Sequence, residues 1–232
     1  MTFLPSEELI NQLDELSALC ADARNNLNRI NDKRNATDVQ HQVLFISLVR
    51  TIKYFEAYLQ LARSGFGEPA AALLRSIYEA SLWMRWSLQS KQNAEIYFGA
   101  SKGEAIRMLK KLLNRGLIQL NKYPEEKVAR EMLNSHLKAV KLPSWDELAR
   151  QSGLEDLHAL IYPQLSAMSH GSLLFIGGRN NIISPVADSE NILSFIPVAN
   201  NIFRDCYILC EEWILHGRLH PVPDFRKLMA QS

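Results

Sequence analysis

The stretch between residues 70 and 88, AAALLRSIYEASLWMRWSL, constrains the fold more than any other part of this chain. Drawn as a helix, it is apolar on nearly every side, and such a helix needs apolar partners around its whole circumference. Pro69, a residue favoured in the first turn of helices, marks its predicted start, and we expect its end near Ser90. The stretch therefore predicts a helix at the centre of a helical bundle.

Apolar residues at helical spacing predict further helices on both sides of this one. Leu9, Leu13 and Leu16, for example, follow Ser6, a good N-cap residue. The other predicted helices cover residues 7–30, 37–65, 92–120, 125–140, 145–152, 154–170 and 189–215, and residues 171–188 predict a loop or small hairpin. The fold class predicted is all-α, a single bundle of seven to eight helices over 1–232 with its core roughly at 37–217.

Composition limits the functional classes. Hydrophobic residues make up 47% and charged residues 22%, which is typical of an ordered globular protein. The net charge of +1 argues against a strongly basic nucleic-acid binder. The densest apolar run, residues 43–49, is far shorter than the roughly 20 residues of a membrane span. With an odd number of cysteines and no signal-peptide pattern, we expect no membrane and a cytoplasmic protein.

The central stretch holds few charges, and two of them lie one helical turn apart. Arg75 and Glu79 are four residues apart and therefore share one face of the helix with Tyr78 and Leu82. Charges beside apolar residues need partners, because an unpaired buried charge is costly. Arginine before glutamate is also the weaker order for stabilising an exposed helix. The pair is therefore expected to do more than support its own helix.

His170 ends a predicted helix, since Gly171 is a favoured residue just past a helix C-terminus, and Ser166 lies one turn earlier. A histidine cation is favoured at that end. If the two helices pack together, His170 meets Glu79 beside Arg75. Three uses stay open: a polar contact that locks helices, a ligand-binding site of Arg75, Glu79, Ser166 and His170, or catalysis by Arg75, Glu79 and His170.

The motifs around Arg75 and His170 resemble those of a known protein family. The segment Leu-Leu-Arg75-Ser-Ile-Tyr-Glu79, followed by Tyr162-x3-Ser166-x3-His170-Gly, resembles a family of uncharacterised bacterial helical proteins known only as a domain of unknown function. The resemblance spans roughly residues 40 to 215. It implies an all-helical fold with Arg75, Glu79 and His170 as characteristic polar residues, and it implies no established activity.

A second segment is similar in spacing to the HEPN ribonucleases, which carry an arginine and a histidine four to six residues apart. Here they are Arg130 and His136, and Glu131 stands where those enzymes prefer an uncharged polar residue. Histidine would move the 2′-hydroxyl proton while arginine steadies the phosphate. The surrounding strip, residues 102–141, has ten basic and four acidic residues. Such a strip suits RNA, a subunit contact or a solvated surface.

Metal and cofactor motifs are weak. Glu155-x2-His158 is half of a di-iron pattern whose second half is missing, and no phosphate-binding or dinucleotide fingerprint is present. We therefore expect neither metal nor cofactor.

The favoured hypothesis is a regulatory module that binds a small anionic ligand or a protein partner at Arg75, Glu79 and His170. Its expected setting, bacterial stress or phage defence, follows from the resemblance alone. The apolar breadth of the central helix leaves room for a homodimer. The alternatives are a HEPN-like, metal-independent ribonuclease using Arg130 and His136, or His170 with Arg75, and a purely structural subunit.

Overall fold

The computed structural model describes residues 5–116, 142–169 and 189–223. Within these ranges the chain forms α-helices and no strand, so the predicted all-α bundle is confirmed. The helices are α1 (Glu7–Lys33), α2 (Val39–Arg63), α3 (Gly67–Gln89), α4 (Lys91–Asn114), α6 (Trp145–Gln151), α7 (Glu155–Ser169) and α9 (Ser189–His216). The helix predicted at 125–140 and the loop or hairpin predicted at 171–188 lie outside the described residues.

Helix α3 is the centre of the bundle, as its sequence predicts. It packs against α2 and α9 on one side and α6 and α7 on the other, and it also contacts α4. Three of its buried residues, Leu74, Ile77 and Leu82, are fully shielded from solvent. The nearly all-round apolar sequence is explained by these partners, because each side of α3 faces another helix.

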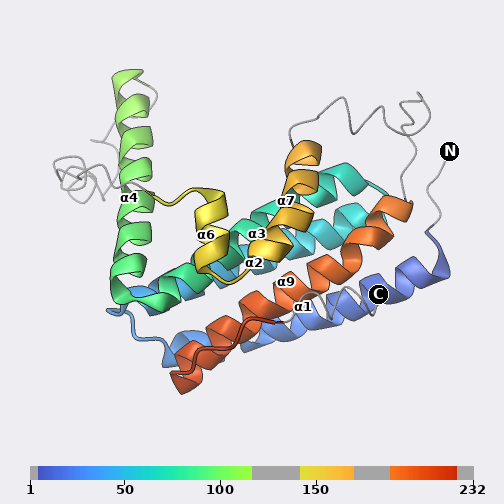
Figure 1. The fold of residues 1–232 in the computed structure, drawn as a ribbon, viewed down its shortest axis with the longest axis horizontal. Coiled ribbons are helices and arrows are strands. Elements are labelled where there is room, and N and C mark those ends of the chain that lie inside the picture. Colours follow the sequence, from blue (N-terminus) through green and yellow to red (C-terminus); the bar gives the residue numbers. More distant parts are fainter. Residues whose placement is uncertain (1–4, 117–141, 170–188, 224–232) are drawn as a thin grey trace.

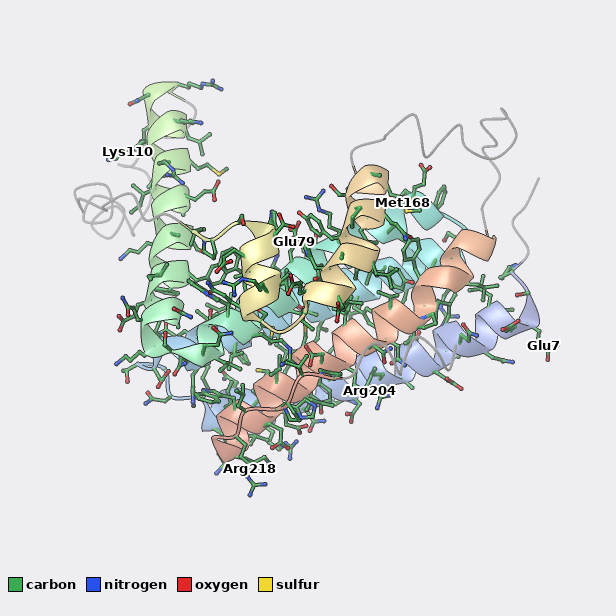
Figure 2. The ribbon with its side chains drawn as sticks, in the orientation of Figure 1. Glu7, Glu79, Lys110, Met168, Arg204 and Arg218 are labelled. Atoms are coloured by element: carbon green, nitrogen blue, oxygen red, sulfur yellow. The ribbon has the colours of Figure 1, made fainter. Side chains whose placement is uncertain are left out.

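The helices form two layers and an arm (Figure 1). Helices α1, α2, α3 and α9 run alongside one another, while the shorter α6 and α7 lie across α3. Helix α4 stands at one end of the bundle and extends beyond it. The core between the long helices includes the rings of Phe55 and Phe203, stacked with centroids 4.1 Å apart. The side of α3 that carries Arg75 and Glu79 lies beneath the short helices α6 and α7 (Figure 2).

Several helix boundaries differ from the predicted ones. Helix α1 continues to Lys33, three residues beyond its predicted end at residue 30. Helix α2 begins at Val39 rather than at residue 37, and the Asp38 side chain caps it by accepting hydrogen bonds from the backbone N–H groups of Gln40 and His41. Helix α3 begins at Gly67, two residues before Pro69. A proline in the first turn is tolerated there because the first N–H groups of a helix have no intrahelical partner.

The three cysteines are buried and free of disulfides. All three pack in the core as small hydrophobic residues. Across the described residues, no helix has the length and apolar character needed to cross a membrane.

Candidate functional site

The candidate site includes three side chains of α3 and α7 that are joined by hydrogen bonds. The Arg75 Nε donates to Glu79 Oε1 over 2.9 Å, and the Arg75 Nη2 donates to the Tyr162 hydroxyl over 3.1 Å. The Tyr162 hydroxyl donates in turn to the same Glu79 oxygen over 3.4 Å. Figure 2 shows Glu79 on α3 between α6 and α7. We call Arg75, Glu79 and Tyr162 the polar cluster.

The polar cluster lies at the edge of the core. The Arg75 side chain is 17% exposed and that of Glu79 is 24% exposed, so water reaches both. The Arg75 guanidinium also lies over the Tyr162 ring, 5.2 Å from its centroid, where a cation–π attraction is favourable. The guanidinium is therefore held in one orientation by a carboxylate, a hydroxyl and an aromatic face.

Protonation in the polar cluster follows from these contacts. Burial acts to lower the pKa of Arg75, but the hydrogen bond and the charge of Glu79 outweigh it, and the pKa is raised. Burial, followed by the charge of Glu79, raises the pKa of Tyr162. At neutral pH the cluster accordingly holds one guanidinium cation and one neutral phenol beside the carboxylate.

His158 supports the polar cluster from below. Its ring stacks on that of Tyr162 with centroids 4.4 Å apart. Its Nδ1 lies 3.1 Å from the hydroxyl of Tyr78, and its Nε2 lies 3.3 Å from Asp146 Oδ1. Burial lowers the pKa of His158 and Asp146 offsets this only in part. Since a carboxylate only accepts, the neutral ring must carry its proton on Nε2 and accept the Tyr78 O–H at Nδ1.

Aromatic rings join α6 and α4 to the same region. Trp145 of α6 packs 6.1 Å from the Tyr162 ring and 5.8 Å from Trp83 of α3. Trp83 stacks on Tyr97 of α4 at 4.5 Å. Offset and tilted pairs of this kind stabilise packing beyond the area that they bury. The rings thus fix α6 and α7 over α3 and keep Tyr162 in place beside Arg75.

The structure brings together some of the residues singled out in the sequence. Arg75 and Glu79 form an ion pair, as their spacing predicts. Ser166 is half-buried one turn beyond Tyr162 on α7, and Tyr162 is the α7 residue that contacts the pair. His170, Arg130 and His136 lie outside the described residues, so their roles stay predictions.

The basic strip is described only as far as residue 116. Its basic residues on this part are all exposed: Lys102, Arg107, Lys110, Lys111 and Arg115. Lys110 lies on the part of α4 that extends beyond the bundle (Figure 2). This surface is separate from the polar cluster.

A second ion pair, which was not predicted from the sequence, joins Arg85 of α3 to Asp205 of α9. Arg85 donates from Nε to Asp205 Oδ2 over 2.9 Å and from Nη2 to Oδ1, and its Nη2 also reaches the Pro221 carbonyl at 3.3 Å. Burial raises the pKa of Asp205, and the Arg85 guanidinium opposes that shift. No local spacing in the sequence joins Arg85 and Asp205, because they belong to different helices.

Metal binding finds no support in the described part of the chain. There, no group of three or more His, Cys, Asp or Glu side chains lies close enough to hold an ion. His158, half of the di-iron pattern, instead contacts Tyr78, Asp146 and Tyr162.

The model of one protein family, "Family of unknown function (DUF5677)", matches residues 41–181, more than half of the chain. The matched range includes Arg75, Glu79 and Tyr162. No curated protein and no solved structure matches the chain.

Proposed function

The chain belongs to this family of unknown function, and we propose that it is a regulatory module that binds a small ligand at the polar cluster. The ligand carries an anionic group, a carboxylate or a phosphate, that binds Arg75. The observation that carries the proposal is the Arg75 guanidinium, fixed in orientation and still 17% exposed where α7 crosses α3.

Arginine suits this task. Its planar group presents several N–H donors and stays charged at any physiological pH, so it binds carboxylates and phosphates with defined geometry. Because Glu79 and Tyr162 hold the guanidinium in advance, little side-chain entropy is lost on binding. Low-dielectric surroundings, here Tyr162 and the half-buried Trp145, strengthen such contacts.

Regulation would follow from the position of the site between two helices. Arg75 and Glu79 belong to α3, and Tyr162 belongs to α7. A ligand that exchanges hydrogen bonds with all three favours one arrangement of α7 on α3 over another, and that difference is what shifts a conformational equilibrium. Ser166 and His170 follow Tyr162 at successive turns in the sequence, and we include them as further proposed ligand contacts.

The proposed biological setting is cytoplasmic, in bacterial stress or phage defence, with the protein as a homodimer. Light scattering of the purified protein tests the oligomeric state directly. A mass near that of one chain would remove the homodimer from the proposal.

The binding proposal is tested by thermal unfolding in the presence of inorganic phosphate, acetate and the standard amino acids. A ligand that binds the folded state raises Tm in proportion to the logarithm of its concentration. We expect at least one probe to raise the Tm of the wild type and not that of Arg75→Gln. Arg24→Gln is the matched control, because Arg24 pairs with Glu56 at 3.0 Å on the exposed surface of α1 and α2.

Two outcomes would contradict binding at Arg75. One is that no probe shifts the Tm of the wild type. The other is that a probe shifts wild type, Arg75→Gln and Arg24→Gln equally. If Arg75→Gln does not fold, Arg75→Lys, which keeps the charge but loses the planar geometry, replaces it. An unstable Arg75 variant together with no binding to the wild type would favour the purely structural role.

The second candidate function is a HEPN-like ribonuclease, which the exposed basic face of α4 favours. RNA cleavage by the purified protein with metal chelated tests it, comparing the wild type with His136→Ala and His170→Ala. Cleavage that His136→Ala abolishes supports Arg130 and His136 as the catalytic pair. No cleavage by the wild type removes this candidate.

A further inference from the structure

We infer that the ligand of the polar cluster is a zwitterion, with an ammonium group next to its anionic group; free α-amino acids are the simplest such class. The inference rests on the proposed function and names the chemical class of ligand for the same site. It follows from two observations, the balance of charge in the cluster and the hydrogen-bonding capacity that the cluster leaves open.

The first observation is that the charges of the polar cluster cancel. Of the described side chains that hydrogen-bond or stack in this region, only Arg75 is a cation at neutral pH, because burial keeps His158 neutral. The Glu79 carboxylate lies 2.9 Å from the Arg75 Nε. A simple anion attracted to Arg75 is therefore repelled by Glu79 at almost the same distance, and a simple cation meets the reverse situation. The net electrostatic attraction is therefore small for a simple anion and for a simple cation.

The second observation concerns the two oxygens of Glu79. Both of its hydrogen bonds, from Arg75 and from Tyr162, end on Oε1. Among the described residues none donates to Oε2, and the Glu79 side chain is 24% exposed. A carboxylate oxygen only accepts hydrogen bonds. The open position of the cluster thus fits a donor, and an ammonium group supplies three N–H donors with a positive charge.

A zwitterion satisfies both observations together. In an α-amino acid the carboxylate and the ammonium group are attached to one carbon, and the guanidinium and carboxylate of the cluster are likewise adjacent. Placed antiparallel to the pair, the ligand carboxylate faces Arg75 and the ligand ammonium faces Glu79 Oε2. The Tyr162 hydroxyl, which already accepts from Arg75 and donates to Glu79, is able to exchange either partner for the ligand.

The test compares ligands that differ by one charge. Each standard amino acid is titrated into the wild-type protein by calorimetry, next to acetate, inorganic phosphate and methylammonium. The best amino acid is then titrated as its N-acetyl derivative, which lacks the ammonium charge, and as its amide, which lacks the carboxylate charge. We expect either blocked form to bind about tenfold or more weakly, because each lacks one of the two charges that would interact with Arg75 or with Glu79.

The variant Glu79→Gln tests the contribution of the Glu79 charge separately from that of the Arg75 charge. This variant keeps the shape of the side chain and removes its charge. We expect it to bind the free amino acid and the N-acetyl derivative with similar affinity, whereas the wild type and the exposed control variant Glu56→Gln keep the preference for the free form. Should Glu79→Gln fail to fold, the comparison of free and blocked ligands on the wild type still decides.

The outcomes distinguish this inference from the proposal beneath it. If acetate, phosphate or the N-acetyl derivative binds the wild type as tightly as the free amino acid, and Arg75→Gln abolishes that binding, the anion site stands and the zwitterion is wrong. If neither amino acids nor simple anions bind, both are wrong. Binding of methylammonium equal to that of the free amino acid also overturns the inference.

Discussion

Helix α3 carries two ion pairs that differ in almost every respect except their chemistry. Arg75 and Glu79 are both on α3, 17% and 24% exposed, and share one carboxylate oxygen with Tyr162. Arg85 reaches across to Asp205 on α9, and the two side chains are only 4% and 1% exposed. In the second pair both oxygens of Asp205 accept from the guanidinium.

The difference in burial suggests different roles for the two ion pairs, one in stability and one in binding. In the Arg85–Asp205 pair, both carboxylate oxygens accept from the guanidinium, and the Pro221 carbonyl accepts a further hydrogen bond from Arg85. Removing one partner would therefore leave the other charge buried without its counter-charge. The Arg75–Glu79 pair is partly solvated and leaves Glu79 Oε2 open among the described residues. The buried pair should therefore govern stability, and the half-exposed pair should govern binding.

The largest expected effect comes from the buried pair. Asp205→Ala leaves the Arg85 guanidinium buried without its carboxylate, and we expect the free energy of unfolding to fall by about 3–5 kcal/mol. Urea denaturation followed by circular dichroism measures it. The double variant Arg85→Met, Asp205→Leu, which removes both charges, should recover most of the loss. A loss below about 1 kcal/mol for Asp205→Ala would mean that water reaches this pair.

Arg75→Gln should have a smaller effect on stability. It removes charged hydrogen bonds from a partly solvated place, so we expect a loss of about 1–2 kcal/mol in the same urea experiment. The contrast with Asp205→Ala is what matters. Equal losses would show that both pairs are structural and would weaken the case for binding at Arg75.

Tyr162→Phe should cost still less, about 1 kcal/mol, because the ring and its stacking on His158 remain and only the hydroxyl is lost. Combining it with Glu79→Gln in a double-mutant cycle measures the coupling between the two side chains. We expect a coupling of about 0.5 kcal/mol or more. Full additivity would place the Tyr162 hydroxyl outside the polar cluster in solution.

The smallest effect is a dependence on pH through His158. Burial lowers the pKa of this histidine below its ordinary value of 6.5, so the unfolded chain takes up the proton first as pH falls. The stabilising effect of the neutral ring is therefore present above 6.5 and is lost as pH falls from there toward the folded pKa. We expect wild-type stability to drop as pH falls below about 6.5, and the stability of His158→Gln to drop less. Parallel curves for the two proteins would contradict this.

Of these two ion pairs, only Arg75–Glu79 was predictable from the sequence, and the reason is physical. Arg75 and Glu79 are four residues apart on one helix, so their contact follows from helix geometry. Arg85 and Asp205 belong to α3 and α9, and no local spacing joins them. The assignment of Arg85 to Asp205 depends on how these two helices pack. Tyr162 belongs to a motif that was recognised in the sequence. Its contact with Arg75 was not predicted, because the two residues belong to different helices, α7 and α3.

What the sequence determined by itself is the helical architecture around an all-round apolar helix. Periodicity and capping act over a few residues, because helical hydrogen bonds close within one turn. The tertiary structure decided which of the charges on α3 are closed and which stay open. The partner of a charged side chain, its exposed fraction and its pKa depend on how two helices pack together. The same pairing of arginine with a carboxylate is therefore buried between α3 and α9 and partly exposed between α3 and α7.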